Sequence, residues 1–237
     1  MKQLEQALIE FGFGGEGLDK RLAQFSRYRE LVLDWNTKVN LTAIKDPEEF
    51  ERKHFVDSVS CCRFPSFFQA NSVIDVGTGA GFPGIPLAIL FPETEFVLLD
   101  SLNKRIKILV EICQELNLKN VTPVHGRAED LARQTMHREQ YDFCLSRAVA
   151  NLAVLSEYCL PFVKVGGWFG AYKTGNAEEE IRRSRQALRL LGGALKTETK
   201  WFPGGVDLDH TILWIQKEQP IGKKFPRKAG TPQKEPL

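Results

Sequence analysis

Apolar residues follow two different periods along the chain. Up to about residue 62 they recur three and four positions apart, which predicts helices over 1–11, 19–38 and 48–62. From residue 72 on, short runs of β-branched and aromatic residues alternate with helical periods. We therefore expect an N-terminal helical cap over residues 1–66, followed by an α/β domain over 67–217.

The second part of the chain predicts a mainly parallel sheet. Strands that alternate with helices pair in parallel and carry helices on both faces of the sheet. The runs are apolar at odd and even positions alike, as expected of strands that are covered on both sides. The predicted strands are 72–76, 96–100, 121–126, 141–148, 167–173 and 211–217, and the predicted helices between them are 84–91, 103–117, 128–135, 151–163 and 177–191.

Composition agrees with one globular domain that carries small additions. The chain has 237 residues, 43% of them apolar and 26% charged, which excludes a disordered or coiled-coil protein. Apolar runs fall well short of the ~20 residues of a membrane span, and the N-terminal residues lack the pattern of a signal peptide. Five cysteines without a CxxC pair are typical of reduced thiols. We expect a cytoplasmic protein that binds neither a membrane nor a metal.

Charge is distributed unevenly along the chain. The net charge is +2, yet residues 217–237 hold six basic and two acidic residues, so the remainder is slightly acidic. Four of the twelve prolines lie in residues 218–237, which predicts an extended, mobile tail. A basic tail suits RNA, and Phe225 is a candidate for stacking on an unpaired base; a solvated tail without a partner is the alternative. The candidate RNA contacts are Lys223, Lys224, Arg227 and Lys228.

The most informative motif is a glycine-rich turn between the first predicted strand and its helix. Gly77 and Gly79 begin a GxGxG pattern at the carboxyl end of the strand, where open parallel sheets bind ligands. Dinucleotide sites use GxGxxG, but Phe82 takes the third glycine position here and Pro83 follows it. This pair disfavours a diphosphate, and the carboxylate of Asp75 favours a cationic or amine-bearing ligand. A tight loop without a ligand is the alternative.

Two later strand ends carry groups that complete a nucleoside site. Asp100 ends the second strand, 23 residues after Gly77, at a spacing that suits hydrogen bonds from ribose hydroxyls. Ala128 and Glu129 follow the third strand, where an adenine ring would reach. The alternative role of Asp100 is to cap the following helix, and that of Glu129 is to place charge, with Asp130, at the start of a helix. Together the three strand ends indicate an adenosine ligand with a sulfonium amino acid in place of phosphates.

The sequence resembles the glucose-inhibited division protein B family nearly end to end. The resemblance is carried by DVGTGAGFPGIPLAI from Asp75, SRAVA from Ser146 and the terminal KKFPRKAGTPQKEPL, with further matches in WNTKVNLT from Trp35 and HFVDS from His54. It implies the class I S-adenosylmethionine-dependent methyltransferase fold, a Rossmann-like, mainly parallel, seven-stranded sheet with one antiparallel strand behind an N-terminal helical cap. It implies an enzyme that transfers a methyl group from S-adenosylmethionine to N7 of a guanine in 16S ribosomal RNA, within the small ribosomal subunit.

The resemblance also assigns site residues. No residue is assigned as a general base, because guanine N7 carries a lone pair and no proton. Catalysis would then come from positioning of the reacting groups, which can lower the activation free energy by roughly 7–11 kcal/mol. Arg147 is the first residue to test, as a ligand of the methionine carboxylate or of an RNA phosphate; an ion pair with Asp75 or Glu129 is the alternative. The implied donor-binding residues are Gly77, Phe82, Ala128, Glu129 and Arg147, and more loosely Gly79 and Asp100.

Other assignments stay open at the level of sequence. His54 is either an RNA contact or a satisfied core histidine, and Lys173 departs from the family pattern because Thr174 separates it from the next glycine. A non-catalytic RNA-binding ribosome assembly factor is the alternative function. A nicotinamide-dependent oxidoreductase is a weaker alternative, because Phe82 replaces the third glycine of its motif. We expect a monomer.

Overall fold

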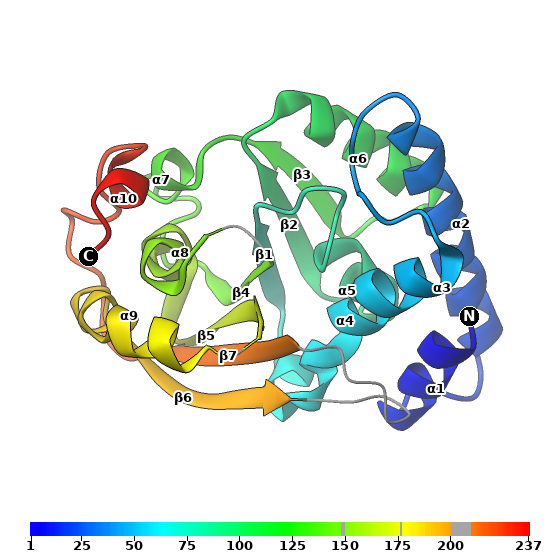
Figure 1. The fold of residues 1–237 in the computed structure, drawn as a ribbon, viewed down its shortest axis with the longest axis horizontal. Helices are drawn as coiled ribbons and strands as arrows, with labels where there is room; N and C mark the ends of the chain where they lie inside the picture. The colour runs from blue at the N-terminus through cyan, green and yellow to red at the C-terminus, as the bar shows by residue number, and fades with distance from the viewer. Residues whose placement is uncertain (148–149, 176, 201–209) are drawn as a thin grey trace.

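Seven strands form one sheet in the order β3-β2-β1-β4-β5-β7-β6 (Figure 1). The computed structural model describes residues 1–147, 150–175, 177–200 and 210–237. β7 runs antiparallel to both of its neighbours, and the pairs from β3 to β5 are parallel. The expected mainly parallel sheet of seven strands is confirmed. The strands are β1 Ser72–Val76, β2 Glu95–Asp100, β3 Val121–His125, β4 Tyr141–Arg147, β5 Val163–Thr174, β6 Gly193–Lys200 and β7 His210–Lys217.

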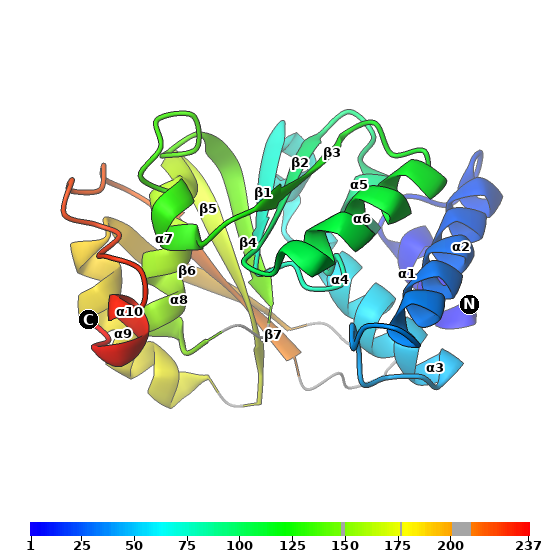
Figure 2. The ribbon, with the colours of Figure 1, turned by 90° about the horizontal axis from the view of Figure 1, so that it is seen from above.

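Helices cover both faces of this sheet. Figure 2 shows α5, α6 and the N-terminal helices on one side, and α7, α8 and α9 on the other. The last residue of the predicted strand 141–148 lies outside the described residues. The helices are α1 Lys2–Glu10, α2 Leu18–Asn36, α3 Pro47–Phe50, α4 Asp57–Val59, α5 Gly84–Leu90, α6 Asn103–Glu115, α7 Ala128–Leu131, α8 Leu152–Cys159, α9 Glu178–Leu190 and α10 Thr231–Lys234.

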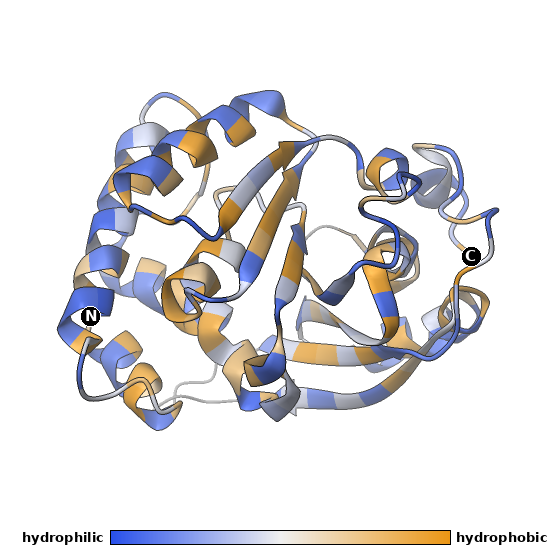
Figure 3. Ribbon diagram, turned by 180° about the vertical axis from the view of Figure 1, so that it is seen from behind, coloured by the Kyte–Doolittle hydropathy of each residue, from blue (hydrophilic) through white to orange (hydrophobic). Residues whose placement is uncertain are grey.

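Alternate residues of the central strands enter two separate cores. Val73 and Phe143 belong to the core under the N-terminal helices, α5 and α6, whereas Ile74 and Cys144 belong to the core under α8. Successive side chains of a strand point to opposite faces, so a sheet that is covered twice needs apolar residues at every position. Figure 3 shows these strands as largely hydrophobic between helices of alternating character.

Several predicted elements differ from the structure. The predicted helix 151–163 ends as α8 at Cys159, and β5 begins at Val163 instead of 167. The predicted helix 48–62 is one helical path with changing hydrogen bonding: α3 leads into a π-helical turn, Glu51–Val56, then α4 and a 3₁₀ turn, Ser60–Arg63. The helix after the third strand ends at Leu131 instead of 135. The edge strand β6 was missed, because its sequence GALKTETK is mostly polar and half of it is exposed.

The N-terminal helices share a core with the sheet. Phe25 and Tyr28 of α2 are fully buried in the same cluster as Val73 and Leu98. The predicted boundary between 66 and 67 falls inside a 3₁₀ turn, Pro65–Gln69. The predicted cap is therefore continuous with the α/β body.

The C-terminal segment is folded onto the body, so the prediction of an extended, mobile tail is wrong. Ile221 and Phe225 are buried in the core under α8. The Arg138 guanidinium donates hydrogen bonds to the carbonyl oxygens of Ile221 and Phe225, at 3.0 and 2.8 Å. The burial of two apolar side chains and these hydrogen bonds stabilise the folded path of the segment, although its prolines favour an extended chain.

The five cysteines are buried and unbridged, as expected. Among the described helices, none is long and apolar enough to cross a bilayer. Within the same residues, no cluster of His, Cys, Asp and Glu is arranged to hold a metal ion.

Candidate active site

The glycine turn after β1 is fixed from two sides. Gly77 and Gly79 have φ angles of 74° and 62°, in the left-handed region where glycine is favoured. The amide of Gly77 donates to the Leu99 carbonyl oxygen of β2 at 2.8 Å. The Tyr28 hydroxyl of α2 donates to the Ala80 carbonyl oxygen at 2.7 Å. The N-terminal helices therefore hold the turn in place.

Asp75 lies beneath this turn and is fully buried. Its Oδ2 accepts hydrogen bonds from the Gly84 amide at 2.9 Å and from the Thr78 hydroxyl at 2.7 Å. Burial raises the pKa of Asp75 to about 6, against the lowering effect of these two donors. Its Oδ1 has no hydrogen-bond partner in the described part of the chain.

These contacts fit a ligand that carries an amine and no diphosphate. The Gly84 amide, at the start of α5, is already bound to Asp75, and the Ile85 amide donates to the Gly81 carbonyl oxygen at 2.8 Å. The first amides of α5 are therefore not available to a phosphate. A buried carboxylate oxygen without a partner suits an ammonium group or a water molecule.

The three predicted strand ends meet around one cavity. We call it the β1–β3 cavity; its volume is about 160 Å³, and it opens at the carboxyl ends of β1, β2 and β3. It brings together Gly77, Asp100, Ala128 and Glu129, as the sequence predicts. The other lining residues are Val76, Leu99, Ser101, Gly126, Arg127 and Tyr158.

Both carboxylates of the β1–β3 cavity are buried and hydrogen-bonded. Asp100 accepts from the amide of Gly79 at 3.0 Å and from the amide of Leu102 at 2.8 Å. Asp100 therefore joins the glycine turn to the chain that enters α6. Glu129 accepts a 2.9 Å hydrogen bond from the amide of Gly230 in the C-terminal segment.

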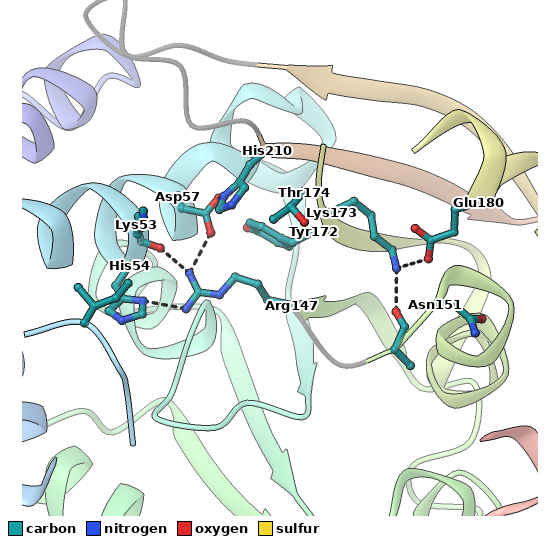
Figure 4. A pocket seen from close by; sticks show the side chains of 12 residues that line it. Lys53, His54, Asp57, Arg147, Asn151, Tyr172, Lys173, Thr174, Glu180 and His210 are labelled. Atoms are coloured by element: carbon teal, nitrogen blue, oxygen red, sulfur yellow. Dashed lines mark hydrogen bonds and ion pairs between the residues drawn. The ribbon is translucent and has the colours of Figure 1, made fainter. Parts of the chain in front are cut away.

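A larger cavity lies at the opposite part of the same sheet edge. We call it the β4–β7 cavity; its volume is about 530 Å³. β7 is antiparallel, so its first residue, His210, lies beside the carboxyl ends of β4 and β5. Figure 4 shows its polar side chains converging from several elements. The lining residues are Ile44, Lys53, His54, Asp57, Arg147, Ala150, Asn151, Tyr172, Lys173, Thr174, Glu180 and His210.

Arg147 is held by an ion pair with Asp57. The guanidinium lies 2.9 Å from Asp57 Oδ2, and it donates to the Lys53 carbonyl oxygen at 3.0 Å (Figure 4). His210 Nδ1 lies 2.7 Å from the other oxygen of Asp57. The alternative of an ion pair between Arg147 and Asp75 or Glu129 is therefore wrong, because Asp57 on α4 is the nearer carboxylate.

His54 is a half-buried, neutral member of this network. Its Nδ1 lies 3.2 Å from the Arg147 guanidinium, and its Nε2 lies 2.7 Å from the Thr42 hydroxyl. Burial and the charge of Arg147 lower the pKa of His54 to about 3. Burial alone would raise the pKa of Asp57, but the hydrogen bond from His210 and the charge of Arg147 bring it below its usual value.

Arg147 lines the β4–β7 cavity, and the Phe82 ring packs against Arg147 and His54 of its wall. The Phe82 ring is buried and stacks on the His54 ring, with 4.4 Å between centroids. The Arg147 guanidinium carbon lies 5.1 Å from the centroid of the Phe82 ring. Of the predicted donor residues, four line the β1–β3 cavity and Arg147 lines the β4–β7 cavity, whereas Gly79 and Phe82 line neither.

Lys173 occupies the opposite wall of the β4–β7 cavity. Its ammonium group lies 2.6 Å from Glu180 and donates to the Ala150 carbonyl oxygen at 2.8 Å. Ala148 and Val149, in the SRAVA motif before it, lie outside the described residues.

The four candidate RNA contacts fall into two groups. Lys223, Lys224 and Lys228 are exposed. The Arg227 guanidinium instead forms three hydrogen bonds, of 3.0, 3.1 and 2.7 Å, with the buried carboxylate of Glu157. This pair gives Arg227 a partner within the protein, and its assignment to RNA stays a prediction. The predicted stacking of Phe225 on a base is wrong because the ring is 4% exposed.

Asp57 and His210 are the site residues that sequence reasoning missed. His210 directly precedes the predicted last strand, 211–217, and is the first residue of β7 in the structure. Asp57 stood within the HFVDS stretch, between apolar residues of a predicted helix. A charged residue inside such a run was the available signal, because buried carboxylates are rarely unpaired.

The sheet order and the two cavities define a class I methyltransferase fold. The solved structures with the same fold include an O-methyltransferase from Bacillus cereus in complex with SAH, at a TM-score of 0.53 and 19% identity, covering 80% of this chain and 90% of that one. A putative O-methyltransferase from Klebsiella pneumoniae matches with a TM-score of 0.52 and 16% identity over the same shares.

Sequence comparison narrows the class. Residues 21–201 match the family described as GidB, rRNA small subunit methyltransferase G. Ribosomal RNA small subunit methyltransferase G of Alkaliphilus metalliredigens is 47% identical over 99% of this chain and 97% of its own length, and that of Clostridium tetani is 46% identical over the same shares. The chain belongs to the rRNA small subunit methyltransferase G family. The resemblance to S-adenosylmethionine-dependent methyltransferases is confirmed, and the family excludes a nicotinamide-dependent oxidoreductase.

Proposed function

We propose that the protein transfers the methyl group of S-adenosylmethionine to N7 of a guanine in 16S ribosomal RNA of the small subunit. The observation that carries the proposal is the pairing of two cavities across the β1–β4 junction, where the strand order reverses. The Ser146 hydroxyl of β4 donates to the Val76 carbonyl oxygen of β1 at 2.7 Å, next to both cavities. A donor on one side and a base on the other would meet at this junction.

The β1–β3 cavity is the proposed place of the methyl donor. Gly77 and Gly79 would allow the ligand to approach the backbone, and Asp100 would accept hydrogen bonds from ribose. Ala128 and Glu129 would bind the adenine. When bound, S-adenosylmethionine supplies a methyl group on a positively charged sulfur. The unpaired oxygen of Asp75 supports this placement, because it suits the amine of an amino acid.

The β4–β7 cavity is the proposed place of the guanine. Its volume of about 530 Å³ falls within the range of roughly 300–1,000 Å³ that is typical of ligand pockets. N7 needs no base to remove a proton, and the pKa of His54, about 3, keeps its ring neutral at physiological pH. Methylation leaves a cationic base, which the carboxylates of Asp57 and Glu180 would stabilise. Arg147, fixed by Asp57 and placed over Phe82, would orient the groups at the junction.

The exposed lysines of the C-terminal segment are proposed to contact RNA phosphates. Lys223, Lys224 and Lys228 offer charge without sequence readout. We further propose that the substrate is the small subunit itself, that the enzyme acts as a monomer and that it is located in the cytoplasm. Ribosomal RNA is the substrate that the family name implies.

A methyl-transfer assay tests the proposal. The protein is incubated with radiolabelled S-adenosylmethionine and small subunits that lack the modification, and N7-methylguanine is mapped by borohydride and aniline cleavage followed by primer extension. We expect label at one guanine of 16S RNA. Label on another atom, or binding of subunits without any transfer to them or to free 16S RNA, contradicts the proposal; the second result is that of an assembly factor.

A further inference from the structure

The C-terminal segment reaches the wall of the β1–β3 cavity. The amide of Gly230 donates a 2.9 Å hydrogen bond to Oε1 of Glu129, across 101 residues of chain. Glu129 is 4% exposed and lines this cavity. Figure 1 shows α10, which begins just after Gly230, next to α7 and α8. A part of the chain with no predicted role in donor binding thus contacts one of the proposed donor ligands.

Arginine side chains fix the backbone of this segment. The Arg138 guanidinium donates to the carbonyl oxygens of Ile221, Gly222 and Phe225, at 3.0, 3.3 and 2.8 Å. Arg133 donates to the Pro226 carbonyl oxygen at 2.5 Å. Such charge-assisted hydrogen bonds to carbonyls hold the path of the chain rather than particular side chains.

A buried ion pair fixes the segment a second time, close to Gly230. Glu157 of α8 is fully buried and accepts hydrogen bonds from the amide and the guanidinium of Arg227. The next residue of α8, Tyr158, lines the β1–β3 cavity. One helix therefore carries both the anchor of the segment and part of the cavity wall.

The turn at Gly230 aims its amide at Glu129. Gly230 has a φ of 83°, a conformation that residues with a Cβ rarely adopt. A Cβ at this position would meet nothing within 4 Å. Backbone conformation, rather than space, is therefore what a substitution at Gly230 would change.

We propose that residues 219–231 form a C-terminal clasp that orients the Glu129 carboxylate for the adenosine part of the methyl donor, with Gly230 as a positioning residue. The inference rests on the proposed function for the identity of the donor. A carboxylate held in one orientation before binding loses less conformational freedom when the ligand arrives, which increases affinity. The coupling is reciprocal, so a bound donor must also stabilise the clasp.

Calorimetric titration with S-adenosylhomocysteine tests the first consequence. In Gly230→Val the amide is displaced, and we expect the dissociation constant to rise about tenfold, as for the loss of one hydrogen bond to a charged group. At saturating donor, kcat and the KM for small subunits are expected to stay near the wild-type values. Gly222→Ala is the matched control, because Gly222 lies in the same clasp and a Cβ there also meets open space. A chain that ends at Lys228 retains Arg227 and is expected to behave like Gly230→Val.

Hydrogen exchange tests the reciprocal consequence, which a purely structural role of the clasp does not produce. We expect S-adenosylhomocysteine to slow exchange in residues 229–231 as well as around Gly77. Unchanged donor affinity in both clasp variants, or protection at Gly77 with none at 229–231, overturns the proposal. The calorimetric and exchange measurements use no RNA, so a wild-type protein that binds the donor without methylating subunits contradicts the proposed function and leaves the clasp supported.

Discussion

The two cavities at the carboxyl edge of the sheet are built in different ways. The β1–β3 cavity is shaped by backbone: glycines with positive φ, amides that bind Asp100, and a short turn at Ala128. The β4–β7 cavity is shaped by side chains from α4, β4, β5, β7 and α9, linked by the ion pair of Arg147 with Asp57. A site formed by backbone can be recognised in the sequence by its glycines. The residues of a side-chain network are scattered singly along the sequence and form no such pattern.

The electrostatics of the two cavities also differ. Beside the β1–β3 cavity, burial raises the pKa of Asp75 to about 6. In the β4–β7 cavity, burial and Arg147 lower the pKa of His54 to about 3. Burial favours the neutral form in both cases, so the acid and the base shift in opposite directions. This contrast lets each side be probed by a separate variant.

Arg147→Ala is expected to have the largest effect. It removes the cation that organises the β4–β7 cavity, and we expect kcat/KM for methyl transfer to fall by about 100-fold or more. Donor affinity in calorimetry is expected to change little, because the β1–β3 cavity stays intact. The variant also removes the arginine partner of the buried Asp57, which keeps its contact with His210, and we expect this to cost up to about 3 kcal/mol in the free energy of unfolding.

A double variant separates the two effects of this substitution. Asp57→Asn combined with Arg147→Met removes both charges, so we expect denaturant unfolding to show most of the stability recovered while activity stays low. Wild-type turnover in Arg147→Ala removes the residue from the mechanism. A loss of donor affinity without a loss of kcat assigns Arg147 to the donor instead.

Asp75 and His54 are expected to change the free energy of unfolding with pH in opposite directions. The folded pKa of Asp75 is raised, so its contribution is present below about pH 4 and lost as the pH rises to about 6. The folded pKa of His54 is lowered, so its contribution is present above about pH 6.5 and lost as the pH falls towards 3. Near pH 5 the two slopes oppose each other, each by up to about 1.4 kcal/mol per pH unit.

Urea unfolding of two variants between pH 4 and 6 checks these signs. Relative to wild type, Asp75→Asn is expected to make stability rise more steeply with pH, and His54→Gln is expected to make it fall. The difference in slope is the measured quantity, because either substitution also changes stability by a constant amount. Equal slopes in all three proteins contradict the contrast between the cavities.

The smallest expected effect concerns the exposed lysines, which lie outside both cavities. In Lys223→Ala/Lys224→Ala/Lys228→Ala, the slope of log affinity for small subunits against log salt is expected to flatten by about 2, at roughly 0.7 per phosphate contact. Donor affinity is expected to stay unchanged. Lys119→Ala, just before β3 at the opposite end of the strands, serves as the control and keeps the wild-type slope. A steep slope in the triple variant assigns RNA contact to another surface.

Local patterns predicted the parts of the molecule that depend on neighbouring residues. The run SVIDV followed by glycines placed β1 and its turn correctly, since a tight turn needs glycine where it occurs. Spacing alone predicted that Gly77, Asp100, Ala128 and Glu129 meet, because successive parallel strands end at one edge. The polar edge strand β6 was missed because it has no buried face, so its sequence shows no alternation of apolar residues.

The amino-acid sequence determined the sheet, the glycine turn and the family, because periodic burial and tight turns constrain residue types locally. The tertiary structure alone decided which charges meet. Asp57 and His210 come together across 153 residues, and Arg227 pairs with the buried Glu157 across 70 residues. The sequence does not show which group a charged side chain will contact. Only packing determines whether its partner is solvent, RNA or another side chain.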